Sequence, residues 1–398
     1  MDGDDLKHSW KYAFATDQSP ELMAKWDKLS CADRIDQIRD QLSAEELSVL
    51  EAQLLQMGGS SLEKTGLLDA LRWWSLGSHT PTGLNDIALH TRLRSGQSEL
   101  HRRIFDHTVS TGHLSYRFKT AIQRVEDSGD VVTVTARDGQ SWKARSVICT
   151  IPLNVLSTIE FDPPLAADKA EALLHKSVNR CNKVHLDING PDYLSWSSLG
   201  TPGKGMVSAF GDHLTNADNS HLVCFGPDPN TPLGITLDDM DTVKDAILHL
   251  FPKDKQDEIV VNRIVSENTK SPHLHTAMFH HSQFLLFSKV SLTHSAQVSH
   301  DWNKDEFSNG TWCFMEPNAT TKYLAALQKR HGNVFFASAD WSDGWRGWID
   351  GAVQSGMEMA RDVMLEQKGT AGKKVMAIRQ MANGVSHLTN GVNGVNGV

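Results

Sequence analysis

The sequence lacks the features of a membrane protein, a nucleic-acid-binding protein or a secreted protein. It has no run of about 20 apolar residues, and its start shows no basic stretch followed by an apolar run and a small-residue cleavage site. Its 39 Lys and Arg are not clustered and are outnumbered by 48 Asp and Glu, so nucleic acid has no electrostatic landing site. We therefore expect an intracellular, cytoplasmic protein without a membrane or nucleic-acid partner.

Cysteine is also scarce. The five cysteines are an odd number, are widely scattered and show no CxxC spacing, which argues against a disulfide framework, a zinc site or a redox pair. We expect reduced, buried, structural thiols and no metal site from Cys31, Cys149, Cys181, Cys224 and Cys313.

What is present suits a globular protein. With 398 residues, 39% of them hydrophobic and 22% charged, the chain can bury a full-sized core in two domains or one large interleaved domain. Residues 1–85 have helical periodicity, with capping-box spacing at Ser30 and Ser43. Ser61 is expected to open a further helix that ends at Gly77.

From Leu114 onward the period changes to two, which indicates strands. Turn residues at 128–130 and 138–139 separate three alternating segments, which predict a β-meander over 121–126, 131–136 and 142–152. Further strands are expected at 183–188, 221–225 and 334–337, and a helix at 352–365. The last strand, a glycine-punctuated loop and this helix form an arrangement familiar from cofactor sites.

Two segments do not fit this pattern. Val265 to Gln297 carries four histidines before an apolar run and has three open interpretations: a metal site, a surface loop, or a translated intron. Defined ligand geometry is not evident there, so the metal site is the least favoured of the three. Residues 368–398 are polar with a recurring Asn-Gly-Val, which predicts a disordered tail.

The most informative stretch is Asn333 to Gly356, NVFFASADWSDGWRGWIDGAVQSG. It resembles the carboxy-terminal flavin motif of the flavin-containing amine oxidase family. A glycine at 351 permits close backbone approach, and the following helix directs its positive end toward an electron-rich ring edge. A strand, turn and helix with aromatic packing alone is the competing interpretation.

Other stretches match the family in order and are similar to its fungal monoamine oxidase branch. They are 25–42, 72–74, 94–98, 149–156 and 181–185, so the resemblance covers about 22–367 apart from the atypical segment. The family begins with a strand, a GxGxxG turn and a helix that hold the ADP half of FAD, and Met1 to Ser19 contains only Gly3. We expect this 398-residue chain by itself to bind FAD very weakly.

The resemblance implies an α+β fold in which a truncated, Rossmann-like FAD-binding domain is interleaved with a substrate domain of mixed sheet and helices. The expected division assigns 1–85 and 166–317 to the substrate domain, with the insert near 265–297, and 86–165 and 318–367 to the FAD domain.

The resemblance also implies site residues. Trp312 and Trp348 match two aromatic positions that face each other before the flavin and guide the amine, and Lys183 matches the lysine that holds a water at the reactive nitrogen. Each of the two tryptophans could instead belong to the core, and the lysine to the surface.

For the cofactor, Trp302 matches a tryptophan that packs near the flavin ring and Ile122 a backbone contact on the adenine side. Asp340, Ile349 and Gly351 match positions of the tail motif. Because Thr311 stands where mammalian relatives carry the flavin-bonding cysteine, the implied FAD is non-covalent.

The activity implied is oxidation of a primary or secondary amine to an imine, which water hydrolyses to an aldehyde, with oxygen reduced to hydrogen peroxide. Its partners are a small amine and oxygen, and both a monomer and a homodimer remain open. The alternatives are a cofactor-free homologue that uses its cavity for another reaction or for binding, and a non-catalytic pseudoenzyme.

Overall fold

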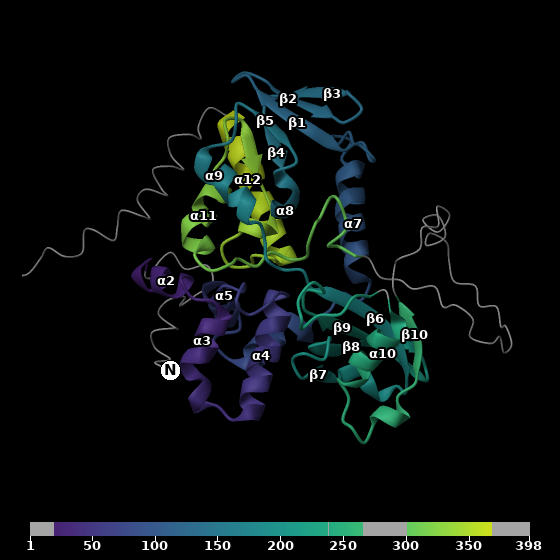
Figure 1. Cartoon of the computed structure of the whole chain (residues 1–398). Coiled ribbons are helices and arrows are strands. Elements are labelled where there is room, and N and C mark those ends of the chain that lie inside the picture. The colour runs from purple at the N-terminus through teal and green to yellow at the C-terminus, as the bar shows by residue number, and fades with distance from the viewer. Residues whose placement is uncertain (1–19, 238, 266–300, 368–398) are drawn as a thin grey trace, which may run out of the picture. The chain divides into compact units, whose positions relative to one another are not determined.

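The computed structural model describes residues 20–237, 239–265 and 301–367. These residues form two compact units, each assembled from separated stretches of the chain (Figure 1). Unit 1 comprises the described residues of 1–29, 66–177 and 312–398, and unit 2 comprises those of 30–65 and 178–311. The expectations for residues 1–19, for nearly all of the segment 265–297 and for the tail 368–398 lie outside the described residues.

Unit 1 contains two sheets. Strands β1 (Ile122–Asp127), β2 (Val132–Ala136) and β3 (Ser141–Ala144) form the expected antiparallel meander, and β5 (Glu160–Asp162) adds to β1 in parallel. The prediction of one continuous third strand at 142–152 is wrong, because this stretch forms two separate strands, β3 and β4 (Val147–Cys149). After β3 the chain leaves the meander, and β4 pairs in parallel with β11 (Val334–Phe336). The predicted strand at 334–337 is confirmed by β11, and its partner is the later part of the stretch predicted as the third strand.

Unit 1 also contains ten helical elements among its described residues, of which the last contacts β11. They are α2 (Pro20–Asp27), α5 (Leu67–Leu76), α6 (Pro81–Asn85), η2 (Asp86–His90), α7 (Gly96–Ser110), α8 (Leu153–Leu156), α9 (Ala167–His175), α11 (Ala319–Gln328), η6 (Ala339–Trp341) and α12 (Ile349–Gln367). The helix expected from Ser61 begins only at Leu67, with Gly66 as its N-cap. Residues 62–64 form a turn instead, so the capping signal at Ser61 misled the prediction.

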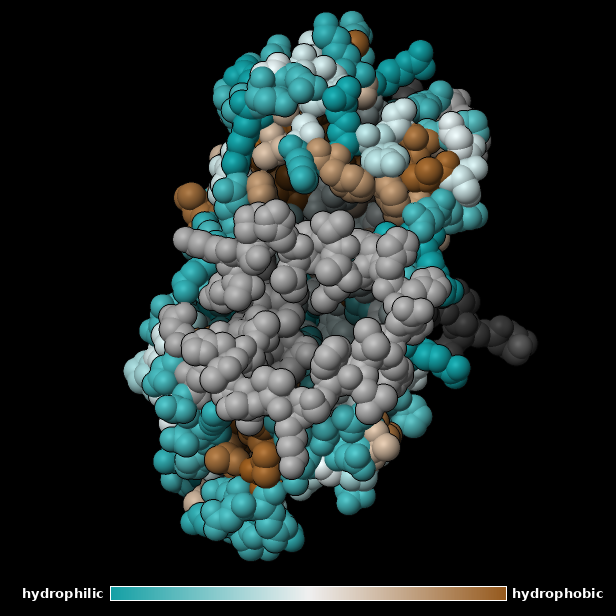
Figure 2. Space-filling view, turned by 90° about the vertical axis from the view of Figure 1, so that its right-hand side faces the viewer, coloured by the Kyte–Doolittle hydropathy of each residue, from teal (hydrophilic) through white to brown (hydrophobic). Residues whose placement is uncertain are grey.

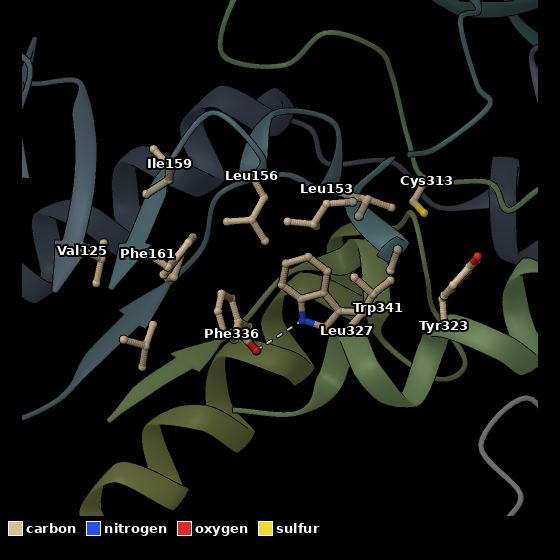
Figure 3. Packing of buried hydrophobic residues seen from close by; sticks show 14 of the residues in the cluster. Val125, Leu153, Leu156, Ile159, Phe161, Cys313, Tyr323, Leu327, Phe336 and Trp341 are labelled. Atoms are coloured by element: carbon tan, nitrogen blue, oxygen red, sulfur yellow. Dashed lines mark hydrogen bonds between the residues drawn. The ribbon is translucent and has the colours of Figure 1, made fainter. Parts of the chain in front are cut away.

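The core of unit 1 lies where these helices meet the strands (Figure 3). Trp341 is fully buried beside Phe336 and Leu327, and its indole N–H donates to the Phe336 carbonyl at 3.2 Å. Burying an indole is favourable only when its polar N–H finds an acceptor. This hydrogen bond therefore ties the loop after β11 to the strand itself.

Unit 2 combines helices with a larger sheet. Its helical elements are α3 (Cys31–Ile38), η1 (Arg39–Gln41), α4 (Ala44–Gly58), η3 (Asp192–Ser195), α10 (Met240–Leu248) and η4 (Gln256–Glu258). Both predicted capping boxes are confirmed: Ser30 and Asp33 cap α3, and Ser43 and Glu46 cap α4, through reciprocal hydrogen bonds. Such boxes satisfy backbone N–H groups that the first helical turn leaves without partners.

The sheet of unit 2 has five strands in the order β10-β6-β9-β8-β7. They are β10 (Val261–Val265), β6 (Asn182–Asn189), β9 (Asn219–Gly226), β8 (Ser208–Asn216) and β7 (Ser197–Leu199), all antiparallel to their neighbours. Alternate residues of β6 pack with α10 in one apolar core. The predictions of strands at 183–188 and 221–225 and of an α+β fold are confirmed.

The observed units differ in their boundaries from the expected domains. Residues 20–29 and 66–85 group with unit 1, although the sequence-based division placed all of 1–85 in the helical part of the substrate domain. The chain passes from unit 1 to unit 2 between residues 177 and 178 and returns between 311 and 312. The expected boundaries were at 165/166 and 317/318. The assignment of these units to cofactor and substrate remains a prediction.

All five cysteines are free and buried, as predicted.

The surface of the described residues combines hydrophobic and hydrophilic side chains (Figure 2). No helix among the described residues is long and apolar enough to cross a bilayer. On the face shown in Figure 2, the coloured hydrophobic residues stand in separate groups among hydrophilic ones.

Candidate functional site

The predicted site residues divide between the two units. Lys183 and Trp302 belong to unit 2. Unit 1 holds the other six: Ile122, Trp312, Asp340, Trp348, Ile349 and Gly351.

The loop between β11 and α12 carries most of the unit 1 residues. Gly347 has φ of 82°, a conformation that side chains disfavour, and a Cβ added there would lie 2.8 Å from the Cys313 carbonyl oxygen. The Gly347 N–H donates to the Ala339 carbonyl at 3.0 Å, which closes the loop on itself. The glycine before Trp348 is therefore required by the fold of the loop.

Gly351 lies in the first turn of α12, so the helix begins at Ile349 rather than at the predicted position 352. A Cβ at this position would lie 2.2 Å from the Trp345 carbonyl oxygen and 2.3 Å from Ser342 Oγ. The sequence suggested that this glycine admits a ligand, but the close neighbours in the structure are the chain's own loop. A role for Ile349 and Gly351 in cofactor binding stays a prediction.

Trp348 stands in an aromatic cluster. Its ring centroid lies 4.8 Å from that of Trp73 and 5.8 Å from that of Trp345, and Trp73 in turn lies 6.1 Å from Phe314. Rings at these separations stabilise one another by about 0.5 to 1.5 kcal/mol beyond their area burial. The cluster fixes the position of the Trp348 indole.

Trp312 lies on a neighbouring stretch of chain. Its Cβ is 3.5 Å from the position that a Cβ on Gly347 would occupy, and its carbonyl accepts a hydrogen bond from Ser177 Oγ at 3.3 Å. The backbones that carry Trp312 and Trp348 are therefore adjacent. The face-to-face pairing of the two rings stays a prediction.

A buried charge network lies at the same loop. Asp69 Oδ1 accepts from Arg72 Nε at 2.8 Å and from Arg346 Nη1 at 3.0 Å, and all three side chains are fully buried. Asp69 Oδ2 also accepts from the Met315 N–H at 2.8 Å. Burial alone would raise the pKa of Asp69, but Arg346 and Arg72 hold it below its usual range. One carboxylate thus faces two guanidinium groups, which leaves positive charge in excess.

Unsatisfied donors gather in the same place. Among the described residues, the buried nitrogens without a hydrogen-bond partner include Nη2 of Arg72 and of Arg346 and Nε1 of Trp73 and of Trp348. All four are donors, and each buried donor left without an acceptor costs about 1 to 3 kcal/mol. This donor set, with its excess positive charge, suits an electron-rich group that accepts hydrogen bonds.

Asp340 and Ile122 have clear structural partners. The Asp340 carboxylate accepts from the Leu153 N–H at 2.7 Å and so supports the first turn of α8. Burial raises the pKa of Asp340, although its hydrogen bonds with Leu153 and Ser338 act in the opposite direction. Ile122 begins β1, where the pairing with β2 shifts register before Arg124. Their cofactor contacts stay predictions.

In unit 2, Lys183 lies on the side of β6 opposite to the apolar core. Its ammonium sits 5.4 Å above the Phe225 ring. The side chain has exposed surface, yet desolvation by the surrounding protein lowers the pKa of Lys183, against the opposing effects of Cys181 and Asp212. Trp302 is about half exposed, at 48%, and its carbonyl accepts from the Gly310 N–H at 2.9 Å.

The match of Thr311 to the flavin-bonding cysteine of mammalian relatives stays a prediction. The Thr311 hydroxyl donates to Asn179 Oδ1. Cys313 is fully buried, and burial raises the pKa of its thiol well above the usual value. Thr311 has no thiol, and the raised pKa keeps the Cys313 thiol protonated, so neither residue supplies a reactive thiolate.

The charge network and the aromatic cluster contain three residues that no sequence pattern predicted as site residues: Asp69, Trp73 and Arg346. Asp69 and Arg72 are three residues apart in an apolar helix, a spacing at which charged side chains meet, and this could have indicated a buried pair. Trp73 lies within the stretch 72–74 that resembles the family, but the resemblance implies no role for it. Nothing local in the sequence indicates that Arg346 joins Asp69, from which it is 277 residues away.

The chain is similar in sequence to two bacterial dehydrogenases. The chain is 26% identical over 354 residues to pseudooxynicotine dehydrogenase of Pseudomonas sp, and 24% identical over 348 residues to nicotine dehydrogenase of Pseudomonas putida. These alignments cover 88% and 87% of this chain but 61% of each relative, so the chain spans less than two thirds of their length.

Solved structures agree at the level of the fold. A putrescine oxidase variant superposes with a TM-score of 0.69 at 19% identity, covering 91% of this chain and 73% of that one. Cyclohexylamine oxidase from Brevibacterium oxydans gives a TM-score of 0.66 at 17% identity, with 92% and 73% covered. The family model for flavin-containing amine oxidoreductases matches residues 12–364. The chain therefore belongs to the flavin-containing amine oxidoreductase family.

Proposed function

We propose that this chain carries the substrate-facing and isoalloxazine-facing parts of an FAD-dependent amine oxidase that converts a primary or secondary amine to an imine and then an aldehyde. FAD, when bound, accepts the hydride equivalent and passes its electrons to oxygen, which forms hydrogen peroxide. The observation that carries the proposal is the family match over residues 12–364.

The residues of unit 1 fit such a cofactor in charge and donor chemistry. The pyrimidine side of a flavin gains negative charge on reduction. The excess guanidinium charge of Arg72 and Arg346, and the helix start at Ile349, place positive potential at the tail motif, which stabilises a nearby anion. The unsatisfied donors at this loop are consistent with the same polarity.

The chain's own side chains would bind and orient the amine. Trp348 presents a planar, electron-rich face that can align an amine without a titrating group, and Trp312 is proposed to supply the opposite face. Lys183, with its lowered pKa, is proposed to hold a water by hydrogen bonding and to assist the oxygen half-reaction. Thr311 makes non-covalent attachment the expected mode. Membership of the fungal branch is part of the same proposal.

The test compares the chain alone with the chain joined to a dinucleotide-binding segment of strand, GxGxxG turn and helix. Both forms are supplied with FAD, and flavin absorbance and amine-dependent peroxide are measured. The amines include those named in the relatives: pseudooxynicotine, nicotine, putrescine and cyclohexylamine. We expect weak binding by the chain alone, because each missing hydrogen bond to a charged group costs about 1.5 to 3 kcal/mol. The joined form should show colour and turnover together.

A matched pair of variants separates the proposal from its alternatives. Trp348→Ala should abolish most turnover while flavin stays bound, whereas Trp142→Ala, on β3 of the same unit, should leave turnover unchanged. Bound flavin without oxidation of any amine would favour a repurposed cavity. Absence of both flavin and turnover in the joined form would favour a non-catalytic homologue.

A further inference from the structure

The face of the unit 2 sheet opposite to α10 carries a polar cluster. Alternation along β6 directs Val184, Leu186 and Ile188 into the core, so Lys183, His185 and Asp187 lie on the other face. On β9, His221 pairs directly with Asp187. The pairing of β6 with β9 thus brings titratable side chains together on one surface.

A bulge in β8 adds two further residues to this surface. Gly211 pairs with Leu222 and His213 with His221, so Asp212 is an extra residue that β9 does not match. A bulge redirects the side chains at that point. As a result Asp212, His213 and His221 each present a ligand atom, and these atoms all lie within 4.8 Å of one another.

Hydrogen bonds set the orientation of His221. Its Nδ1 lies 2.7 Å from Asp187 Oδ1, which also accepts from Thr215 Oγ1 at 2.8 Å. Because a carboxylate only accepts, Nδ1 carries the proton and Nε2 presents its lone pair. A carboxylate that holds the outer nitrogen of an imidazole is the usual support for a metal-binding histidine.

His185 lies next to this lone pair. Its Nδ1 is 3.1 Å from His221 Nε2. His185 is not among the three residues whose ligand atoms all lie within 4.8 Å of one another, so it neighbours the cluster as a hydrogen-bonding partner of His221.

We propose that Asp212, His213 and His221 bind one divalent transition-metal ion of the Zn²⁺ class, with Asp187 as the positioning residue. Two imidazoles and one carboxylate suit Zn²⁺, Co²⁺ or Ni²⁺, whereas Mg²⁺ and Ca²⁺ prefer oxygen ligands throughout. Three protein ligands leave a position for water. His213 is exposed, which gives an ion access from solvent.

The test is Zn²⁺ titration of the chelator-treated full chain by calorimetry, with Co²⁺ and its visible absorption as a second probe. We expect one site that Mg²⁺ does not compete for. His213→Gln should weaken binding by about 100-fold or more, and Asp187→Asn by about 10- to 100-fold, the usual loss for a supporting carboxylate. His249→Gln, which changes an exposed histidine of the same unit, is the matched control and should bind as the unaltered chain does.

The histidines at 273, 275, 280 and 281 could also bind metal, so a variant with all four changed to Gln is needed. Zn²⁺ binding that disappears in this variant and survives in His213→Gln would overturn the proposal. So would the absence of stoichiometric binding by the unaltered chain. Circular dichroism of each variant guards against loss of binding through unfolding. His213 is exposed, so its substitution should leave the fold intact.

Discussion

The guanidinium of Arg346 lies 3.0 Å from the carboxylate of Asp69, and neither side chain is exposed to solvent. Arg72 shares the same carboxylate oxygen. Asp69→Asn would therefore leave two buried cations without a counter-ion. We expect a loss of about 3 to 5 kcal/mol in the free energy of unfolding, measured by urea denaturation. Asp36→Asn removes an exposed partner of Arg39 and should cost less than about 1 kcal/mol. Equal effects of the two substitutions would refute the proposed energetic role of the buried network.

Two glycines of α12 should respond to alanine in opposite ways. Gly351→Ala places a Cβ 2.2 Å from the Trp345 carbonyl oxygen, so the loop or the helix start has to shift. Gly356→Ala meets nothing within 4 Å and replaces a flexible residue inside a helix. We expect Gly356→Ala to raise the free energy of unfolding by about 0.5 to 1 kcal/mol and Gly351→Ala to lower it. A Gly351→Ala protein with the same free energy of unfolding as the unaltered protein would contradict this prediction and show that the loop can move at little cost in free energy.

Lys169 should make stability depend on pH. The residue is only 3% exposed, its Nζ donates to the Leu327 carbonyl at 2.7 Å, and burial lowers the pKa of Lys169 to about 7. The unfolded chain, with an ordinary lysine pKa of about 10.4, binds more protons than the folded chain above pH 7, so stability rises as pH rises.

Lys169→Met should remove this rise. Between pH 7 and pH 9 the difference between the unaltered protein and the variant should amount to about 2 kcal/mol, because one proton is involved and each unit is worth about 1.4 kcal/mol. Lys204→Met, which changes an exposed lysine, should follow the unaltered protein. Parallel stability curves for Lys169→Met and the unaltered protein would show that the buried ammonium is not titrating in this range.

Lys183 offers a kinetic prediction that rests on the proposed function. In the flavin-bound, joined form, Lys183→Met should slow flavin reoxidation by oxygen by about 10²-fold, the usual value of a positioned proton donor. Reduction by the amine should be little changed, and Lys204→Met should change neither half-reaction. Stopped-flow measurement of both half-reactions checks this, and an equal loss in both would indicate disturbed binding instead.

Local features of the fold could be predicted from the sequence. The capping boxes at Ser30 and Ser43 depend on residues three apart, and the strand β6 depends on simple alternation. The end of β3 could not be predicted, because residues 147–149 are equally suited to the meander and to β11. Which partner they choose is decided by tertiary packing, which local propensity does not contain.

The candidate site shows the same limit. The tail motif located Trp348 and Gly351 because a long sequence pattern identifies a family. The ring contact with Trp73 joins distant stretches of chain, as does the charge network around Asp69. The bulge that brings Asp212 beside His213 and His221 is a matter of register, and alternation alone places neighbouring residues on opposite faces.

The interleaving of the two units has a consequence for synthesis on the ribosome. Unit 2 is complete in sequence at residue 311, whereas unit 1 needs residues 312 onward, including β11 and the Asp340 that meets Leu153 from 187 positions away. Because contacts distant in sequence form late and slowly, β4 must wait for β11, which is made after all of unit 2. Unit 2 can therefore close first, and unit 1 closes only after β11 and the residues that follow it have emerged.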